Sequence, residues 1–186
     1  MKKIVLFFSL AVFAIYGCQQ KEEPKTQFQP PVGQGQLPPT GVGGPVQGID
    51  TAKLLQDAVK KDPKNVNAWI ELGNLMMDTK RYNEAIEAYT KALEIEPKNV
   101  NVRVDLGTCY RYAGKSDLAV REYKKALEYD PNHINGHKNM AVVLTYDLKD
   151  YKQALKEFEK VLVLEPNGPD TAAVRTEIEK LKTMVK

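Results

Sequence analysis

Two histidines lie four residues apart in the chain, at His133 and His137. This spacing places two side chains on one face of a helix, where imidazoles can bind a single zinc ion. A zinc site needs further ligands, and no third ligand is evident nearby in the sequence. We therefore prefer a packed or partly exposed histidine pair. A metal- or thiol-dependent enzyme built on this pair and Cys109 is the alternative.

The other residues that could do chemistry do not form a site. Gly114-Lys115-Ser116 imitates the end of a phosphate-binding loop, but Cys109 stands where that motif requires its first glycine. The motifs HExxH, CxxC and GxSxG do not occur. No base is expected beside Cys109, and a buried thiol of this kind packs as a small hydrophobe. The sequence thus predicts a protein that is not an enzyme and that holds no metal and no cofactor.

The overall charge argues against a nucleic-acid partner. The 186 residues include 27 Lys and Arg against 24 Asp and Glu, a formal net charge of +3, and 42% of them are hydrophobic. Binding to phosphates requires a concentrated basic face, which this balance does not provide. Two cysteines are too few for a disulfide framework. We expect a domain that is stabilised by packing and does not bind nucleic acid.

The first 18 residues combine charge, hydrophobicity and a cysteine in the order of an export signal. Two lysines precede an apolar run over residues 4–16, which is typical of a signal peptide and too short for a membrane-spanning helix. The run ends in Ile15-Tyr16-Gly17-Cys18, which resembles the lipobox of bacterial lipoproteins. The resemblance implies that residues 1–17 are cleaved and that Cys18 carries acyl chains such as palmitate. An uncleaved anchor with an incidental cysteine is the alternative.

The same resemblance implies a location in the cell envelope. The lipid would hold the protein in a bilayer facing the periplasm, and Gln19 in place of aspartate after the cysteine favours the outer membrane. Residues 18–48 would serve as a tether. Six Pro, six Gly and seven Gln within residues 19–48 leave too little apolar surface for folding, so we expect this tether to be disordered.

Residues 49–186 repeat at a period of 34. Each unit ends at a proline, and these prolines are Pro63, Pro97, Pro131 and Pro166. The last spacing is 35, which predicts one inserted residue in a turn around residues 147–150. The apolar and small residues of each unit recur at helical spacing on two successive helices. Asn65 and Asn99 follow a proline by two residues, so we predict that they are helix N-caps.

These residues resemble the tetratricopeptide repeat (TPR), whose pattern is W-x₂-L-G-x₂-Y followed by A, F, A and P. The first unit matches at Trp69, Leu72, Gly73, Ala85, Tyr89, Ala92 and Pro97. Arg103 and His137 replace the first aromatic residue in the second and third units. The resemblance implies an all-α fold, a right-handed αα-superhelix of three helical hairpins over residues 66–99, 100–133 and 134–168. An N-terminal half-repeat helix capped by Asp50 and a capping helix over residues 170–185 complete eight expected helices.

In the resembled family the first helices of the hairpins line a concave face that binds peptides. The matching positions include Asp78 and the candidate site residues Asn67, Asn74, Asn101, Arg111, Tyr112, Asn135, Lys138 and Tyr146. Asparagines would hydrogen-bond a peptide backbone, and tyrosines would anchor it. With Arg111 and Lys138 as the cations, we expect a peptide of modest acidic character. Equally, these residues could be only solvated.

Some members of the family clamp a C-terminal carboxylate with Lys and Asn, but Ile70 and Asp105 stand at two of those positions, so we expect no such clamp. The expected function is a membrane-anchored periplasmic scaffold that binds a partner protein. Lipoproteins of similar plan assist assembly of type IV pilus secretins, and this is the preferred specific case. An adaptor that docks peptidoglycan hydrolases is the alternative.

Overall fold

The computed structural model describes the backbone of residues 45–185 and the side chains of residues 51–185. The predicted signal peptide, the acylated Cys18 and the tether up to residue 44 lie outside the described residues. Within the described residues the fold is all-helical, as predicted, with eight helices and no strand. The helices are α1 (Pro45–Lys61), α2 (Val66–Asp78), α3 (Tyr82–Ile95), α4 (Val100–Tyr112), α5 (Ser116–Tyr129), α6 (Ile134–Tyr146), α7 (Tyr151–Leu164) and α8 (Thr171–Met184).

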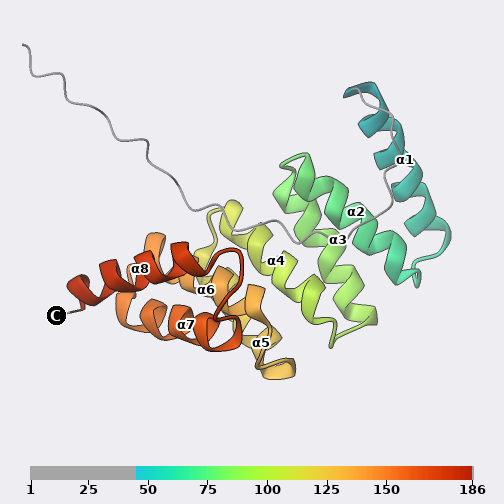
Figure 1. The fold of residues 1–186 in the computed structure, drawn as a ribbon. Coiled ribbons are helices and arrows are strands. Elements are labelled where there is room, and N and C mark those ends of the chain that lie inside the picture. The colour runs from blue at the N-terminus through green and yellow to red at the C-terminus, as the bar shows by residue number, and fades with distance from the viewer. Residues whose placement is uncertain (1–44, 186) are drawn as a thin grey trace, which may run out of the picture.

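The helices stack in chain order from α1 at one end to α8 at the other (Figure 1). α2 with α3, α4 with α5 and α6 with α7 form three hairpins, and the second helix of each hairpin packs against the first helix of the next. α1 packs on α2 as an unpaired half-unit, and α8 packs on α7. This arrangement confirms the predicted solenoid, in which each unit buries its apolar face against its neighbours.

Two boundaries near the start of the solenoid differ from the prediction. α1 begins at Pro45, inside the segment predicted as a tether up to residue 48, and Asp50 lies within α1 rather than at its N-cap. Proline is favoured at the first position of a helix, because the N–H that it lacks would have no partner there. The insertion lies where the spacing predicts it, since α6 and α7 are joined by residues 147–150 whereas the earlier hairpins have turns of one residue fewer.

Asparagine caps start the first two hairpins, as predicted. Asn65 Oδ1 accepts a hydrogen bond from the N–H of Ala68 at 3.0 Å, and Asn99 Oδ1 accepts one from Val102 at 3.2 Å. Each cap satisfies a backbone donor that the helix itself leaves without a partner. The cap of the third hairpin was not predicted, because the residue at that position is a histidine, His133.

Each of the first two hairpins closes around a tyrosine ring packed against a glycine. A Cβ atom added at Gly73 would lie 2.5 Å from Cε1 of Tyr89, and one added at Gly107 would lie 2.5 Å from Cε1 of Tyr123. Both rings are almost completely buried, so neither can swing into solvent. The two glycines therefore set how closely the helices of a hairpin approach each other.

The buried apolar side chains come from several helices and pack between them. They form two buried clusters, one in the N-terminal and one in the C-terminal half of the stack, and Tyr110 packs against both. No helix of the described residues has both the length and the hydrophobicity that crossing a bilayer would require.

We expect Gly107→Ala to lower the free energy of unfolding by about 1–3 kcal/mol, because the added methyl group overlaps the Tyr123 ring in a packed core. Alanine is intrinsically the better helix former by about 1 kcal/mol, so propensity alone would change stability in the opposite direction. Urea denaturation followed by circular dichroism measures the difference.

Gly114→Ala is the matched control. An added Cβ atom meets nothing within 4 Å there, but the φ of +74° is unfavourable for alanine, so we expect a loss of about 1 kcal/mol without any clash. An unchanged or higher unfolding free energy for Gly107→Ala would show that the ring contact does not set the helix spacing.

Candidate protein-binding face

Three equivalent side chains make the same contact at the corner between one hairpin and the preceding loop. Each donates a hydrogen bond to the carbonyl oxygen of the proline six residues earlier. The pairs are Trp69 Nε1 with Pro63 at 3.0 Å, Arg103 Nη2 with Pro97 at 2.6 Å and His137 Nε2 with Pro131 at 3.0 Å. Indole, guanidinium and imidazole all offer an N–H group at this reach. This shared donor explains how arginine and histidine can replace the aromatic residue.

Arg103 and His137 also pair with the second helix of their own hairpin. Arg103 Nη1 lies 2.7 Å from Oε2 of Glu122, and His137 Nδ1 lies 2.7 Å from Oε2 of Glu157. Burial lowers the pKa of His137, but the hydrogen bonds to Glu157 and Pro131 outweigh it and raise the pKa above its ordinary value. Both ring nitrogens of a protonated His137 donate, which leaves no lone pair for a metal ion.

His133 is engaged in a different way, as the N-cap of α6. Its Nδ1 accepts a hydrogen bond from the N–H of Gly136 at 3.0 Å, and its Nε2 lies 2.9 Å from Oδ1 of Asn101. An accepting Nδ1 and a donating Nε2 require the neutral imidazole, and burial lowers the pKa of His133. The two histidines therefore hold separate structural contacts instead of forming a shared metal site.

Cys109 is fully buried on α4. Burial, with a smaller contribution from the carboxyl group of Asp105, raises the pKa of the Cys109 thiol to about 12. A thiol in this state is neither a nucleophile nor a metal ligand at neutral pH. Across the described side chains, no group of three metal-ligating residues comes together. The three residues of the metal- or thiol-enzyme alternative thus make separate structural contacts: His133 caps α6, His137 pairs with Glu157, and Cys109 packs in the core.

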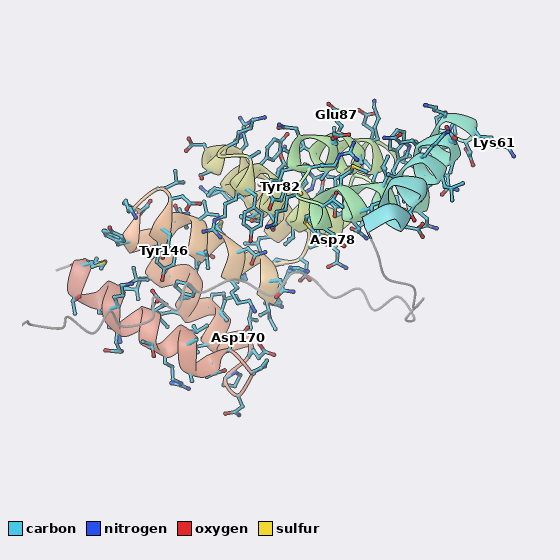
Figure 2. The ribbon with its side chains drawn as sticks, turned by 90° about the horizontal axis from the view of Figure 1, so that it is seen from above. Lys61, Asp78, Tyr82, Glu87, Tyr146 and Asp170 are labelled. Atoms are coloured by element: carbon cyan, nitrogen blue, oxygen red, sulfur yellow. The ribbon has the colours of Figure 1, made fainter. Side chains whose placement is uncertain are left out.

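We call the predicted peptide-binding positions on α2, α4 and α6 the first-helix face. Figure 2 shows Asp78 of α2 and Glu87 of α3 on opposite sides of the first hairpin. Asp78 lies on the first-helix face, and Glu87 lies on the side that faces away from it. Asn67 and Asn101 are exposed on the face, and Asn135 is half-buried. The three recurring asparagines thus lose exposure toward the C-terminal end.

Two of the predicted asparagines already have protein partners. Asn74 accepts a hydrogen bond from the hydroxyl group of Tyr89 at 2.6 Å, and Asn101 contacts His133. Tyr123 makes the equivalent contact to Thr108 at 3.2 Å. The tyrosine hydroxyl groups therefore reach from the core to the first-helix face, where they orient polar side chains.

The two cations predicted for this face are both neutralised by the chain itself. Lys138 was predicted as a cation available to a partner, but it is only 4% exposed. Its Nζ lies 2.6 Å from Oδ2 of Asp170. Arg111 Nε lies 2.8 Å from Oδ2 of Asp147 in the lengthened turn. Both cations are therefore engaged within the chain, and the selection of an acidic peptide stays a prediction. The sequence could not show these pairs, because each joins residues more than 30 positions apart.

The two predicted anchor tyrosines have different environments. Tyr112 is 44% exposed and stacks on Tyr82, with ring centroids 5.1 Å apart. Tyr146 is half-buried, and the Nζ of Lys180 lies 5.3 Å from its ring centroid. Burial and the nearby carboxylate of Glu177 raise the pKa of Tyr146. Tyr112 is available to a partner, whereas Tyr146 belongs to the contact with α8.

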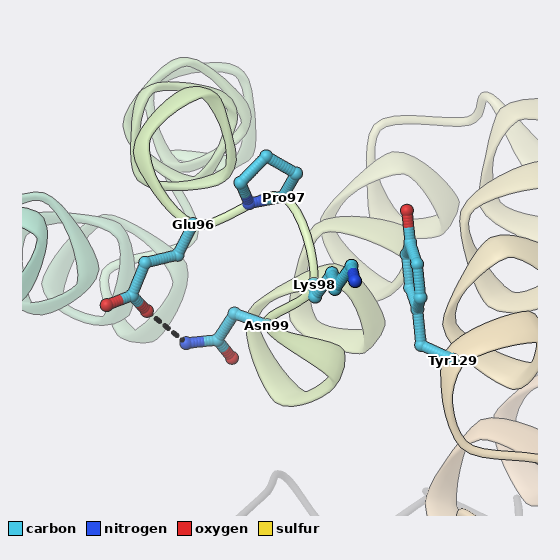
Figure 3. Close-up of a pocket in the computed structure, with 5 residues that line it drawn as sticks. All are labelled: Glu96, Pro97, Lys98, Asn99 and Tyr129. Carbon is cyan, nitrogen blue, oxygen red and sulfur yellow. Dashed lines mark hydrogen bonds between the residues drawn. The ribbon is translucent and has the colours of Figure 1, made fainter.

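Two hollows that were not predicted from the sequence lie at loops. One of about 490 Å³ lies between residues 96–99 and Tyr129, and Figure 3 shows Lys98 facing the tyrosine ring. The other, of about 340 Å³, lies between residues 80–84 and the end of α4, beside Tyr112. Both form only where neighbouring hairpins meet, so the periodicity within one unit carries no signal for them.

The two histidines predict opposite effects of pH on stability. The raised pKa of His137 means that its contribution is fully present below the ordinary value of about 6.5 and is lost as the pH rises through the folded-state pKa. The lowered pKa of His133 means that its contribution is present above about 6.5 and is lost as the pH falls. Titration of the two imidazoles by NMR should place them on opposite sides of the ordinary value.

The other hairpins supply matched replacements for both histidines. His137→Arg copies the pair of Arg103 with Glu122, and His133→Asn copies the caps at Asn65 and Asn99. We expect both variants to fold. His137→Arg should remove the decrease of the urea midpoint as the pH rises, and His133→Asn should remove the decrease as the pH falls. If the two histidines titrate together near the ordinary value, these contacts do not control their protonation.

Known proteins share the stacked helical hairpins of this structure. Residues 51–171 match the family model of the Cytochrome c-type biogenesis protein H TPR domain. No curated protein matches the chain.

Several solved structures share the fold. A crystal structure of MamA has a TM-score of 0.61 at 18% identity, covering 70% of this chain and 81% of that chain. The Arabidopsis OM64 TPR domain has a TM-score of 0.58 at 21% identity, covering 63% and 94%. The first TPR of Spaghetti (RPAP3) bound to the HSP90 peptide SRMEEVD has a TM-score of 0.60 at 23% identity, covering 67% and 95%. Because the family model matches more than half of its residues, the chain belongs to the family of the Cytochrome c-type biogenesis protein H TPR domain, whose fold is a scaffold for protein–protein interaction.

Proposed function

We propose that this chain is a lipid-anchored scaffold on the periplasmic side of a bacterial outer membrane, and that it binds a partner protein through the first-helix face. The observation that carries the binding role is that Asn67, Asn101 and Tyr112 stay exposed on this face. The candidate catalytic residues, in contrast, are held in packing contacts. The anchoring role rests on the lipobox-like sequence that ends at Cys18.

The fold supports a binding role, because stacked hairpins present an extended surface on which a peptide can lie. The RPAP3 structure was solved with a peptide of HSP90, so a TPR stack of comparable length can hold a short segment. We propose the same use of the face here, although the partner differs, because Ile70 and Asp105 replace residues of the carboxylate clamp.

A type IV pilus secretin is the first partner to test, since lipoproteins of this plan assist secretin assembly. The family match favours a second candidate, the assembly of c-type cytochromes, because the description of the family names cytochrome c biogenesis. Both candidates would place the protein among components of the cell envelope.

Cys18→Ala should move the protein from the membrane fraction to the soluble fraction without loss of helical circular dichroism. Several acyl chains bind a bilayer firmly because each buried methylene contributes about 0.8 kcal/mol. Cys109→Ala is the control, because it removes the other cysteine and should leave the protein in the membrane. Continued membrane attachment of Cys18→Ala would contradict the lipid anchor.

A photo-cross-linking residue placed at Asn67 or Asn101 should capture a partner in intact envelopes, because both positions are exposed on the first-helix face. The same residue at Glu87, which is also exposed but lies on the other side of the first hairpin (Figure 2), should capture much less. Mass spectrometry of the products identifies the partner. Equal capture from both sides, or none from the first-helix face, would contradict the binding role.

A further inference from the structure

The N-terminal half of the first-helix face carries acidic groups that no cation within residues 51–185 neutralises. α2 contains no Lys or Arg. The cations of α4 are Arg103, which pairs with Glu122, and Arg111, which pairs with Asp147. Among the described residues, Asp78 and Asp105 have neither an ion pair nor a hydrogen bond through their carboxylates. This half of the face therefore has uncompensated negative charge.

Asp105 is the group of greatest interest, because it is half-buried and has no partner. Burial raises the pKa of its carboxyl group to about 7. The charge of Asp105 also acts on Tyr89 of α3 and on Cys109 of α4, and the charge of Asp78 acts on Tyr89 as well. Both carboxyl groups thus act electrostatically on Tyr89, whose hydroxyl group donates its hydrogen to Asn74 and not to either of them.

The next hairpin shows how the same position looks when the chain supplies a partner. Asn139 is equivalent to Asp105, and its Nδ2 donates to Oγ1 of Thr108 at 3.3 Å. Thr108 is itself equivalent to Asn74 and contacts the hydroxyl group of Tyr123. The ionised carboxylate of Asp105 has no hydrogen to donate, so in this form it cannot make the bond that Asn139 makes.

We propose that the face formed by α2 and α4 binds a basic segment of the partner, and that Asp105 and Asp78 receive its Lys or Arg side chains. This inference rests on the proposed function and gives the chemistry of the partner. A cation placed there supplies the counter-charge that Asp105 lacks. Asn67 and Asn101 are exposed on the same face, where Asn67 and the Nδ2 group of Asn101 can contact the peptide backbone while the Oδ1 of Asn101 accepts from His133. The end of α4 and α6 need no such partner, because Arg111 of α4 already pairs with Asp147 and Lys138 of α6 pairs with Asp170.

The proposal predicts that Asp105 lowers stability and raises affinity. Asp105→Asn should raise the urea midpoint at pH 8, because it removes a poorly solvated charge without a partner. The same variant should weaken binding of a basic peptide. A residue that serves only folding would not change the two quantities in these opposite directions.

The test uses the full chain in detergent and two fluorescent peptides of about 12 residues, one of alternating Ser and Lys and one of alternating Ser and Glu. Fluorescence anisotropy at low salt gives the affinities. We expect the Lys peptide to bind at least about tenfold more tightly than the Glu peptide, although the chain has a formal net charge of +3. Asp105→Asn should weaken the Lys peptide about five- to tenfold, and Asp78→Asn less, because its carboxylate is exposed.

Glu87→Gln is the matched control, since it removes one exposed carboxylate from the opposite side of the hairpin and should change affinity by less than about twofold. Binding of the Lys peptide should also strengthen as the pH rises through 7 in the wild type but not in Asp105→Asn. Tyr89 and Cys109, the ionisable groups affected by Asp105, stay neutral in that range because burial raises their pKa values.

Three outcomes would overturn the inference. They are equal affinities of wild type and Asp105→Asn for the Lys peptide, tighter binding of the Glu peptide, and no binding of either peptide at about 1 mM. These outcomes differ from failure of the proposed function. A partner cross-linked at Asn67 through a neutral or acidic segment would reject the basic segment and keep the scaffold role. No partner on this face would reject both.

Discussion

The close packing of a tyrosine ring on a glycine is the contact on which the rest of this structure depends. At Gly73 and Gly107 there is no room for even one methyl group, so the two helices of a hairpin approach as closely as the tyrosine ring between them allows. That approach brings the hydroxyl groups of Tyr89 and Tyr123 through the core to the first-helix face, where they bind Asn74 and Thr108. The packing of the core thus fixes the positions of polar groups on the surface.

Equivalent positions of the hairpins keep a contact while they change its chemistry. The corner donor is an indole at Trp69, a guanidinium at Arg103 and an imidazole at His137, and the acceptor is a proline carbonyl each time. Where the donor is charged, a glutamate stands opposite on the second helix, as Glu122 and Glu157 do. A buried charge requires a counter-charge, so the two positions change together.

One half-buried charge on α4, Asp105, does not follow this pattern of paired charges. Asp105 is a half-buried carboxyl group without a counter-charge, whereas Lys138 and Arg111 on the same face are paired. The face is therefore divided into a C-terminal half whose charges are neutralised by the chain and an N-terminal half that carries free negative charge. The unpaired carboxyl groups on α2 and α4 are the basis of the proposal that this part of the face binds a basic segment.

The sequence by itself determined the period, the eight helices, the asparagine caps and the turn with the inserted residue, because these depend on spacing within a unit of about 34 residues. It also named Asn67, Asn101 and Tyr112 as candidate binding residues; all three are exposed in the structure, and their role in binding stays a prediction. Only the tertiary structure decided which surface charges remain free, because Arg111 finds Asp147 and Lys138 finds Asp170 across neighbouring units. It likewise separated His133, a cap, from His137, an ion-pair partner. Pairing between units depends on how the hairpins stack, and that geometry is absent from the pattern of any one unit.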